Sequence, residues 1–264
     1  MLKICTQDQA FLPRGLKERF KKVKEMGFYG YEIDGSLLLN NLDEVKEAVK
    51  ETGLPVVSAC GGYRGWIGDF IEERRLNGIE DIQKILEALQ EIGGKGIVVP
   101  AAWGMFTFRL PPMQSPRSEV GDRKAILDSL EILDKKAGET NTTVFLEPLN
   151  RYQDHMINTL AAARSIIEEG KFQNVKIIAD AYHMNIDEDN MFQSLIDNKD
   201  LVKHVHIAEN HRFQPGTGSM DFKKLFKTLK DINYDGYVVY ECRIRGENPE
   251  KEYQKSLEYL KSCE

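Results

Sequence analysis

The sequence predicts an α/β protein built as a (β/α)8 barrel of eight parallel strands, a single domain that spans residues 1–264. Three observations predict it. Strand-like and helix-like segments alternate along the whole chain, with eight pairs in 264 residues. This number and order of elements are typical of such a barrel. The strand candidates are short, β-branched and mostly apolar, as strands covered on both faces are. No glycine-rich dinucleotide turn follows the first strand, which disfavours the alternative, an open doubly wound sheet.

Each strand candidate is a short apolar run. In chain order they are "KICT" (3–6), "GYEI" (30–33), "VVSAC" (56–60), "GIVVP" (96–100), "TVFLE" (143–147), "VKIIAD" (175–180), "VKHVHIA" (202–208) and "GYVVYE" (236–241). The segments between them place apolar residues at helical spacing. They include 16–27 and 42–53, which each end in the helix-stop residue Gly, and 79–94, 221–236 and 250–263.

No linker rich in Ser, Gly or Pro divides the chain. The one long irregular stretch is 103–122, "WGMFTFRLPPMQSPRSEVGD", after the fourth strand. Loops of this length in a compact domain are usually functional or disordered.

Composition excludes several classes of function. The chain is 41% hydrophobic, has a net charge of −6 and carries no basic block, so we expect no nucleic-acid partner. No stretch approaches the roughly 18 apolar residues of a membrane helix, and we expect no membrane contact. The four cysteines are scattered, and the N-terminus lacks the apolar core of a signal peptide. We therefore expect a reduced, cytoplasmic protein.

Ionisable residues mark the last four strands. Glu147 ends the fifth strand, Asp180 ends the sixth, His206 lies in the seventh and Glu241 ends the eighth. Because active sites of such barrels lie at the carboxyl ends of the strands, these four side chains should meet at one rim. His204, two residues before His206, should face the same way one layer deeper.

Three carboxylates at one rim repel each other, and a divalent cation would relieve the repulsion. Two Glu, one Asp and one imidazole favour one Mn²⁺ or Mg²⁺ ion, with Co²⁺ or Zn²⁺ possible. Such a site would leave room for substrate oxygens.

At these residues the sequence resembles the xylose-isomerase-like barrels, and most closely the ketose 3-epimerases that act on D-tagatose or D-psicose. The motifs are "EPLNRY" (147–152), "DAYHMN" (180–185), "HIAENHR" (206–212) and "YEC" around Glu241. They fall on the expected strands in the expected order, so the resemblance covers essentially the whole chain.

The resemblance implies a role for each matching residue. Glu147, Asp180, His206 and Glu241 look like the metal ligands, Glu147 and Glu241 also like the acid–base pair, and His183 and Arg212 like binders of substrate oxygens. One position departs from the pattern, because Gln153 stands where these epimerases often carry a second Glu, which puts the sugar in doubt. Relatives of this type are commonly dimers or tetramers, so the resemblance also implies a homo-oligomer.

The residues fit this chemistry on their own. Epimerising carbon 3 of a ketose or keto-sugar acid removes a proton next to a carbonyl, and two glutamates could remove and return it on opposite faces through an enediolate. Trp66 and Trp103, after the third and fourth strands, could wall the sugar or serve packing. Three alternatives stay open: another sugar isomerase or an inosose-dehydratase-type enzyme on the same site, an endonuclease-IV-like DNA-repair enzyme, and a sugar-binding protein without activity.

Overall fold

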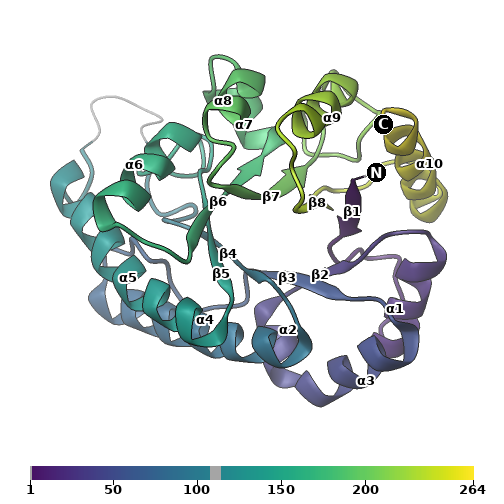
Figure 1. Cartoon of the computed structure of the whole chain (residues 1–264), viewed down its shortest axis with the longest axis horizontal. Coiled ribbons are helices and arrows are strands. Elements are labelled where there is room, and N and C mark those ends of the chain that lie inside the picture. The colour runs from purple at the N-terminus through teal and green to yellow at the C-terminus, as the bar shows by residue number, and fades with distance from the viewer. Residues whose placement is uncertain (1, 108–113) are drawn as a thin grey trace.

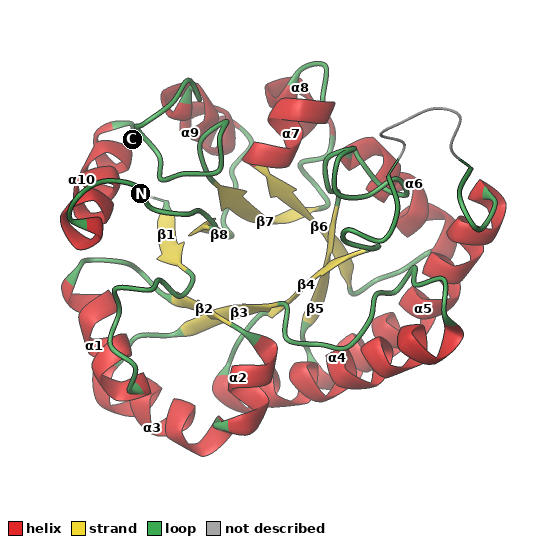
Figure 2. Ribbon diagram, turned by 180° about the vertical axis from the view of Figure 1, so that it is seen from behind, coloured by secondary structure: helices red, strands yellow, loops and turns green. Residues whose placement is uncertain are grey.

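The chain folds as a closed barrel of eight parallel strands in the order of the sequence, with the helices outside (Figure 1). This computed structural model describes residues 2–107 and 114–264. Figure 2 shows the same ring of strands from behind, enclosed by the helices. The predicted (β/α)8 barrel is confirmed.

The strands lie close to their predicted positions. Their bounds are β1 Lys3–Thr6, β2 Tyr31–Ile33, β3 Val56–Cys60, β4 Gly96–Pro100, β5 Thr143–Glu147, β6 Val175–Asp180, β7 Val202–Ile207 and β8 Tyr237–Tyr240. Only β2, β7 and β8 are shorter than predicted. Glu241 follows β8 directly, and its backbone N–H still donates to the carbonyl of Ile207 (3.2 Å).

The helices fill the connections between strands. Their bounds are α1 Leu16–Glu25, α2 Gly35–Asn40, α3 Leu42–Thr52, α4 Glu72–Ile92, α5 Glu119–Thr140, α6 Leu160–Gly170, α7 Ala181–Asp187, α8 Met191–Asp197, α9 Phe222–Asp231 and α10 Pro249–Ser262. The predicted loop at 103–122 is too long, because α5 begins at Glu119. The Ser118 side chain caps it by accepting from the Gly121 N–H. Residues 108–113 of that loop lie outside the described residues.

Short helices that the sequence did not predict follow two of the strands. Asp34 caps α2 by accepting from the Leu37 N–H, and Asp180 caps α7 by accepting from the Tyr182 N–H (2.8 Å). Both helices start within two residues of a strand end and have only six and seven residues. This is too short for a clear helical pattern of apolar residues.

The main apolar core lies between the strands and the surrounding helices. Two smaller apolar clusters consist of strand residues alone: Cys5, Val57 and Val239 in one, and Val98, Phe145 and Ile178 in the other. No helix in the described part of the chain is long and apolar enough to cross a membrane.

Candidate active site

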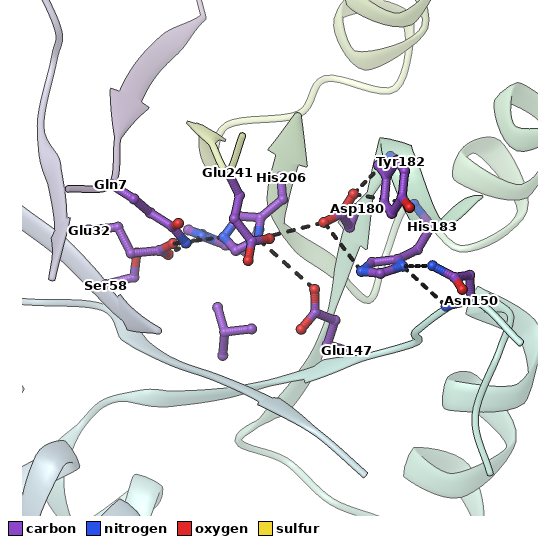
Figure 3. A network of polar contacts seen from close by, with 12 residues as sticks. Gln7, Glu32, Ser58, Glu147, Asn150, Asp180, Tyr182, His183, His206 and Glu241 are labelled. Atoms are coloured by element: carbon purple, nitrogen blue, oxygen red, sulfur yellow. Dashed lines mark hydrogen bonds and ion pairs between the residues drawn. The ribbon is translucent and has the colours of Figure 1, made fainter. Parts of the chain in front are cut away.

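The four side chains predicted at one rim do meet there. One ligand atom from each of Glu147, Asp180, His206 and Glu241 can be chosen so that all lie within 4.8 Å of one another. Figure 3 shows them converging from β5, β6, β7 and the end of β8. His206 Nδ1 lies 2.7 Å from a Glu241 oxygen, 3.9 Å from Asp180 Oδ2 and 4.0 Å from Glu147 Oε1.

Glu147 is the least satisfied member of this group. Its carboxylate is buried, and Oε1 has no hydrogen-bond partner among the described residues. Burial raises the pKa of Glu147 well above its usual range, and the charge of Glu241 raises it further. A buried anion without partners is costly, so this oxygen is suited to a proton or a cation.

Neighbouring charges shift the pKa values of Asp180 and His206 against the effect of burial. Burial alone would raise the pKa of Asp180, but the positive charge of Arg212 holds it below the usual range. Burial would likewise lower the pKa of His206, but the charges of Glu32 and Glu241 raise it well above 6.5.

Arg212 supplies a fixed positive charge at this site. Its guanidinium donates to Asp180 Oδ2 (2.7 Å) and to Glu241, and it lies over the Tyr182 ring, 4.7 Å from the centroid. The backbone of Arg212 is left-handed (φ 63°). That conformation is held by a bond from its N–H to the Glu209 carbonyl and one to its carbonyl from the Arg243 N–H. The loop after β7 is therefore shaped to aim this side chain inward.

His183 is placed as a neutral hydrogen-bond donor. Its Nδ1 accepts from the backbone N–H of Asn150 (3.1 Å), so the ring proton belongs on Nε2. Burial lowers the pKa of His183, which keeps the ring neutral. Nε2 lies 3.8 Å from Asp180 Oδ2.

A cavity of about 300 Å³ opens above these groups. Its wall is formed by Cys60, Gly61, Tyr63, Trp66, Val98, Pro100, Trp103, Glu147, Leu149, Gln153, His183, Arg212 and Glu241. Every predicted substrate-binding residue is in this set. Trp66 packs edge-on against Tyr63 (5.6 Å between centroids), and Trp103 lies 6.4 Å from Trp66 with 56% of its surface exposed. One wall of the cavity is therefore aromatic, as the walls of small-molecule binding pockets often are.

Sequence reasoning missed Glu32. This residue of β2 is 1% exposed and accepts four hydrogen bonds, from Gln7 Nε2 (2.8 Å), Ser58 Oγ (2.6 Å), His204 Nε2 (2.8 Å) and His206 Nε2 (2.8 Å). Figure 3 shows Glu32 with Gln7, Ser58 and His206 around it. A signal was present, because a Glu between Tyr31 and Ile33 in a short strand must point into the barrel. His204 lies one layer deeper than His206, as expected, and stacks on Phe145 (4.8 Å between centroids).

The donor set fits a divalent cation. Three carboxylates and an imidazole nitrogen lie within reach of one point, and the orphaned oxygen of Glu147 faces the others. Hard oxygen donors with one nitrogen suit Mn²⁺ or Mg²⁺. The fold and this group of side chains define a class of barrel proteins with an acidic, histidine-containing site at the carboxyl ends of strands β5–β8.

Comparison with known sequences agrees with this class. The family model described as "Xylose isomerase-like TIM barrel" matches residues 20–263. The chain belongs to that family.

Individual relatives are epimerases by name. The chain is 65% identical to 3-dehydro-D-guloside 4-epimerase of Escherichia coli strain K12, over 99% of this chain and 100% of that protein. It is 34% identical to a ketose 3-epimerase of Arthrobacter globiformis, over 88% of this chain and 78% of that protein. Ketose 3-epimerases, the group singled out from sequence, are thus relatives at greater distance.

Solved structures give the same picture. A crystal structure of 3-keto-D-glucoside 4-epimerase from E. coli superimposes with a TM-score of 0.98 at 65% identity, covering 100% of both chains. A D-psicose 3-epimerase structure gives a TM-score of 0.85 at 19% identity and covers 99% of each chain. That second likeness shows the shared fold.

Proposed function

We propose that the protein is a metal-dependent epimerase of keto sugars that inverts carbon 4 of a 3-keto hexoside. Its 65% identical relative and a more distant one are both named sugar epimerases, which supports this proposal. The sequence alone favoured carbon 3 of a ketose. Both positions are carbons next to a carbonyl, so the chemistry expected from the residues stays the same. Only the position of the reacting carbon in the sugar differs.

The observation that carries the proposal is the pair of glutamates. Glu147 and Glu241 both line the cavity, and they enter it from strands that lie three apart around the barrel. Inverting a carbon next to a carbonyl requires removing a proton from one face and returning one to the other. One of these glutamates would remove the proton on its side of the carbon, and the other would return a proton on the opposite side.

Glu147, Asp180, His206 and Glu241 would hold the cation. When bound, a divalent ion of this kind acts as a Lewis acid on carbonyl and hydroxyl oxygens and stabilises the negative charge of an enediolate.

The neighbouring side chains would bind and orient the sugar. His183 offers an Nε2–H donor to a substrate oxygen, and Arg212 adds a fixed positive charge where negative charge develops. Gln153 can donate as well as accept, unlike the Glu expected from ketose 3-epimerases. Trp66 and Trp103 would cover the apolar face of the ring and exclude water.

The test is an isotope-exchange panel. The protein loaded with Mn²⁺ is incubated in D₂O with 3-keto glucosides, free 2-ketoses and keto-hexonates, and the products are read by NMR. We expect deuterium at carbon 4 of the 3-keto glycosides together with the inverted isomer. Deuterium at carbon 3 of a free ketose with none in the glycosides would return the assignment to a ketose 3-epimerase. No exchange in any substrate would refute epimerisation through an enediolate.

A further inference from the structure

The interior of the barrel below the rim holds a second group of ionisable side chains. Glu32, His204 and His206 lie close enough together to resemble a metal site. However, the Glu32 carboxylate already accepts four hydrogen bonds, two on each oxygen: Gln7 and His206 on Oε1, Ser58 and His204 on Oε2. A carboxylate has about four lone-pair sites, so none remains for a cation.

His206 belongs to both groups through its two ring nitrogens. Nε2 lies 2.8 Å from Glu32 Oε1, and Nδ1 lies 2.7 Å from a Glu241 oxygen. The carboxylate of Glu32 can only accept, so Nε2 must carry a proton. By the same argument Nδ1 donates to Glu241 in the metal-free structure, so both nitrogens carry a proton there. Since Glu32 retains the proton on Nε2, Nδ1 is the nitrogen that would give up its proton and turn its lone pair to a cation at the rim.

We propose that Glu32 is the positioning residue that makes His206 a metal ligand: it fixes the ring orientation and holds the proton on Nε2, so that Nδ1 is the nitrogen that binds the cation. The inference rests on the proposed metal-dependent function. Carboxylates that accept from the distal nitrogen of a ligand histidine raise its basicity, and their loss typically weakens metal binding 10- to 100-fold.

The neighbours of Glu32 make its own geometry rigid. Ser58 and Gln7 donate from β3 and from the end of β1, and His204 donates from one layer deeper. His204 Nδ1 is buried without a hydrogen-bond partner among the described residues, which is consistent with a neutral ring that donates through Nε2. The carboxylate is thus held from four sides and cannot follow His206 if that ring turns.

The experiment compares Mn²⁺ affinity in matched variants by isothermal titration calorimetry. Glu32→Gln replaces the acceptor pair with one acceptor and one donor, and should weaken Mn²⁺ binding by about 10- to 100-fold. Ser58→Ala removes a bond to the same carboxylate without touching His206, and should change the affinity less than about threefold. High Mn²⁺ concentrations should restore much of the turnover of Glu32→Gln.

Two results would overturn the inference. The first is a Glu32→Gln protein that melts earlier but binds Mn²⁺ as the wild type does, because Glu32 would then serve only folding. The second needs no variant: in Mg²⁺-loaded, ¹⁵N-labelled wild type, His206 should carry its proton on Nε2, and a proton on Nδ1 contradicts the role. A wild type that turns over substrate without binding Mn²⁺ would instead refute the proposed metal dependence, and the inference with it.

Discussion

Replacing Arg212 by Met should destabilise the metal-free protein much more than the metal-loaded one. In the metal-free site the guanidinium compensates Asp180 and Glu241, and only 17% of its side chain is exposed. Removing one partner of a buried ion pair costs about 3–5 kcal/mol, and the partial exposure of Glu241 places this case near 3 kcal/mol. For a chain of this length, with about 2 °C per kcal/mol, the melting temperature should fall by about 6 °C.

The assay is thermal unfolding at one scan rate in EDTA and again with saturating Mn²⁺. A bound divalent ion compensates the same carboxylates, so the loss should shrink to about 2 °C, or roughly 1 kcal/mol. Arg243→Met is the matched control, since Arg243 is exposed on the same rim and should shift the midpoint little in either buffer. An equal loss with and without Mn²⁺ would refute the reasoning, because Arg212 and the ion would then not share the same partners.

Other predictions concern the chemistry and the pocket. Glu147→Gln and Glu241→Gln should each lower kcat by about 10²- to 10⁴-fold with an unchanged circular dichroism spectrum; wild-type turnover in either variant would remove that glutamate from the mechanism. Mn²⁺ affinity should rise with pH, because Glu147 and His206 have raised pKa values and must lose protons to bind the ion. Calorimetry at several pH values checks this, and a flat profile would contradict it. Trp66→Ala should raise KM about tenfold and leave kcat nearly unchanged. Steady-state kinetics that show a lower kcat with an unchanged KM would contradict this. Gln153→Glu should raise the ratio of kcat/KM for free 2-ketoses over 3-keto glycosides, and an unmoved ratio would show that this position does not select the sugar.

The barrel and the rim could be read from the sequence because their signals are local. Each strand is a short apolar run, and Glu147 and Asp180 each end one. Strand order in a (β/α)8 barrel follows chain order, so residues at consecutive strand ends become neighbours without further information.

The role of Glu32 could not be read in the same way. Its partners Ser58, His204 and His206 come from strands that meet only when the barrel closes, and their hydrogen bonds depend on which layer each side chain enters. The short helices α2 and α7 were not predicted for a related reason. Their start depends on the Asp34 and Asp180 caps rather than on apolar periodicity. The reacting carbon could not be predicted from the sequence either, because the proposed pair of glutamates could act on a proton next to any carbonyl.

The parts of the site sit on different segments of the barrel. The acidic group with His206 comes from strands β5–β8, whereas the aromatic wall of Tyr63, Trp66 and Trp103 comes from loops after β3 and β4. Loops tolerate insertion and substitution far better than strands do. The two loops can therefore change in sequence and length while the acidic group at the strand ends stays the same. Under the proposed function, randomising those loops and keeping the strand ends is the route to a new sugar substrate.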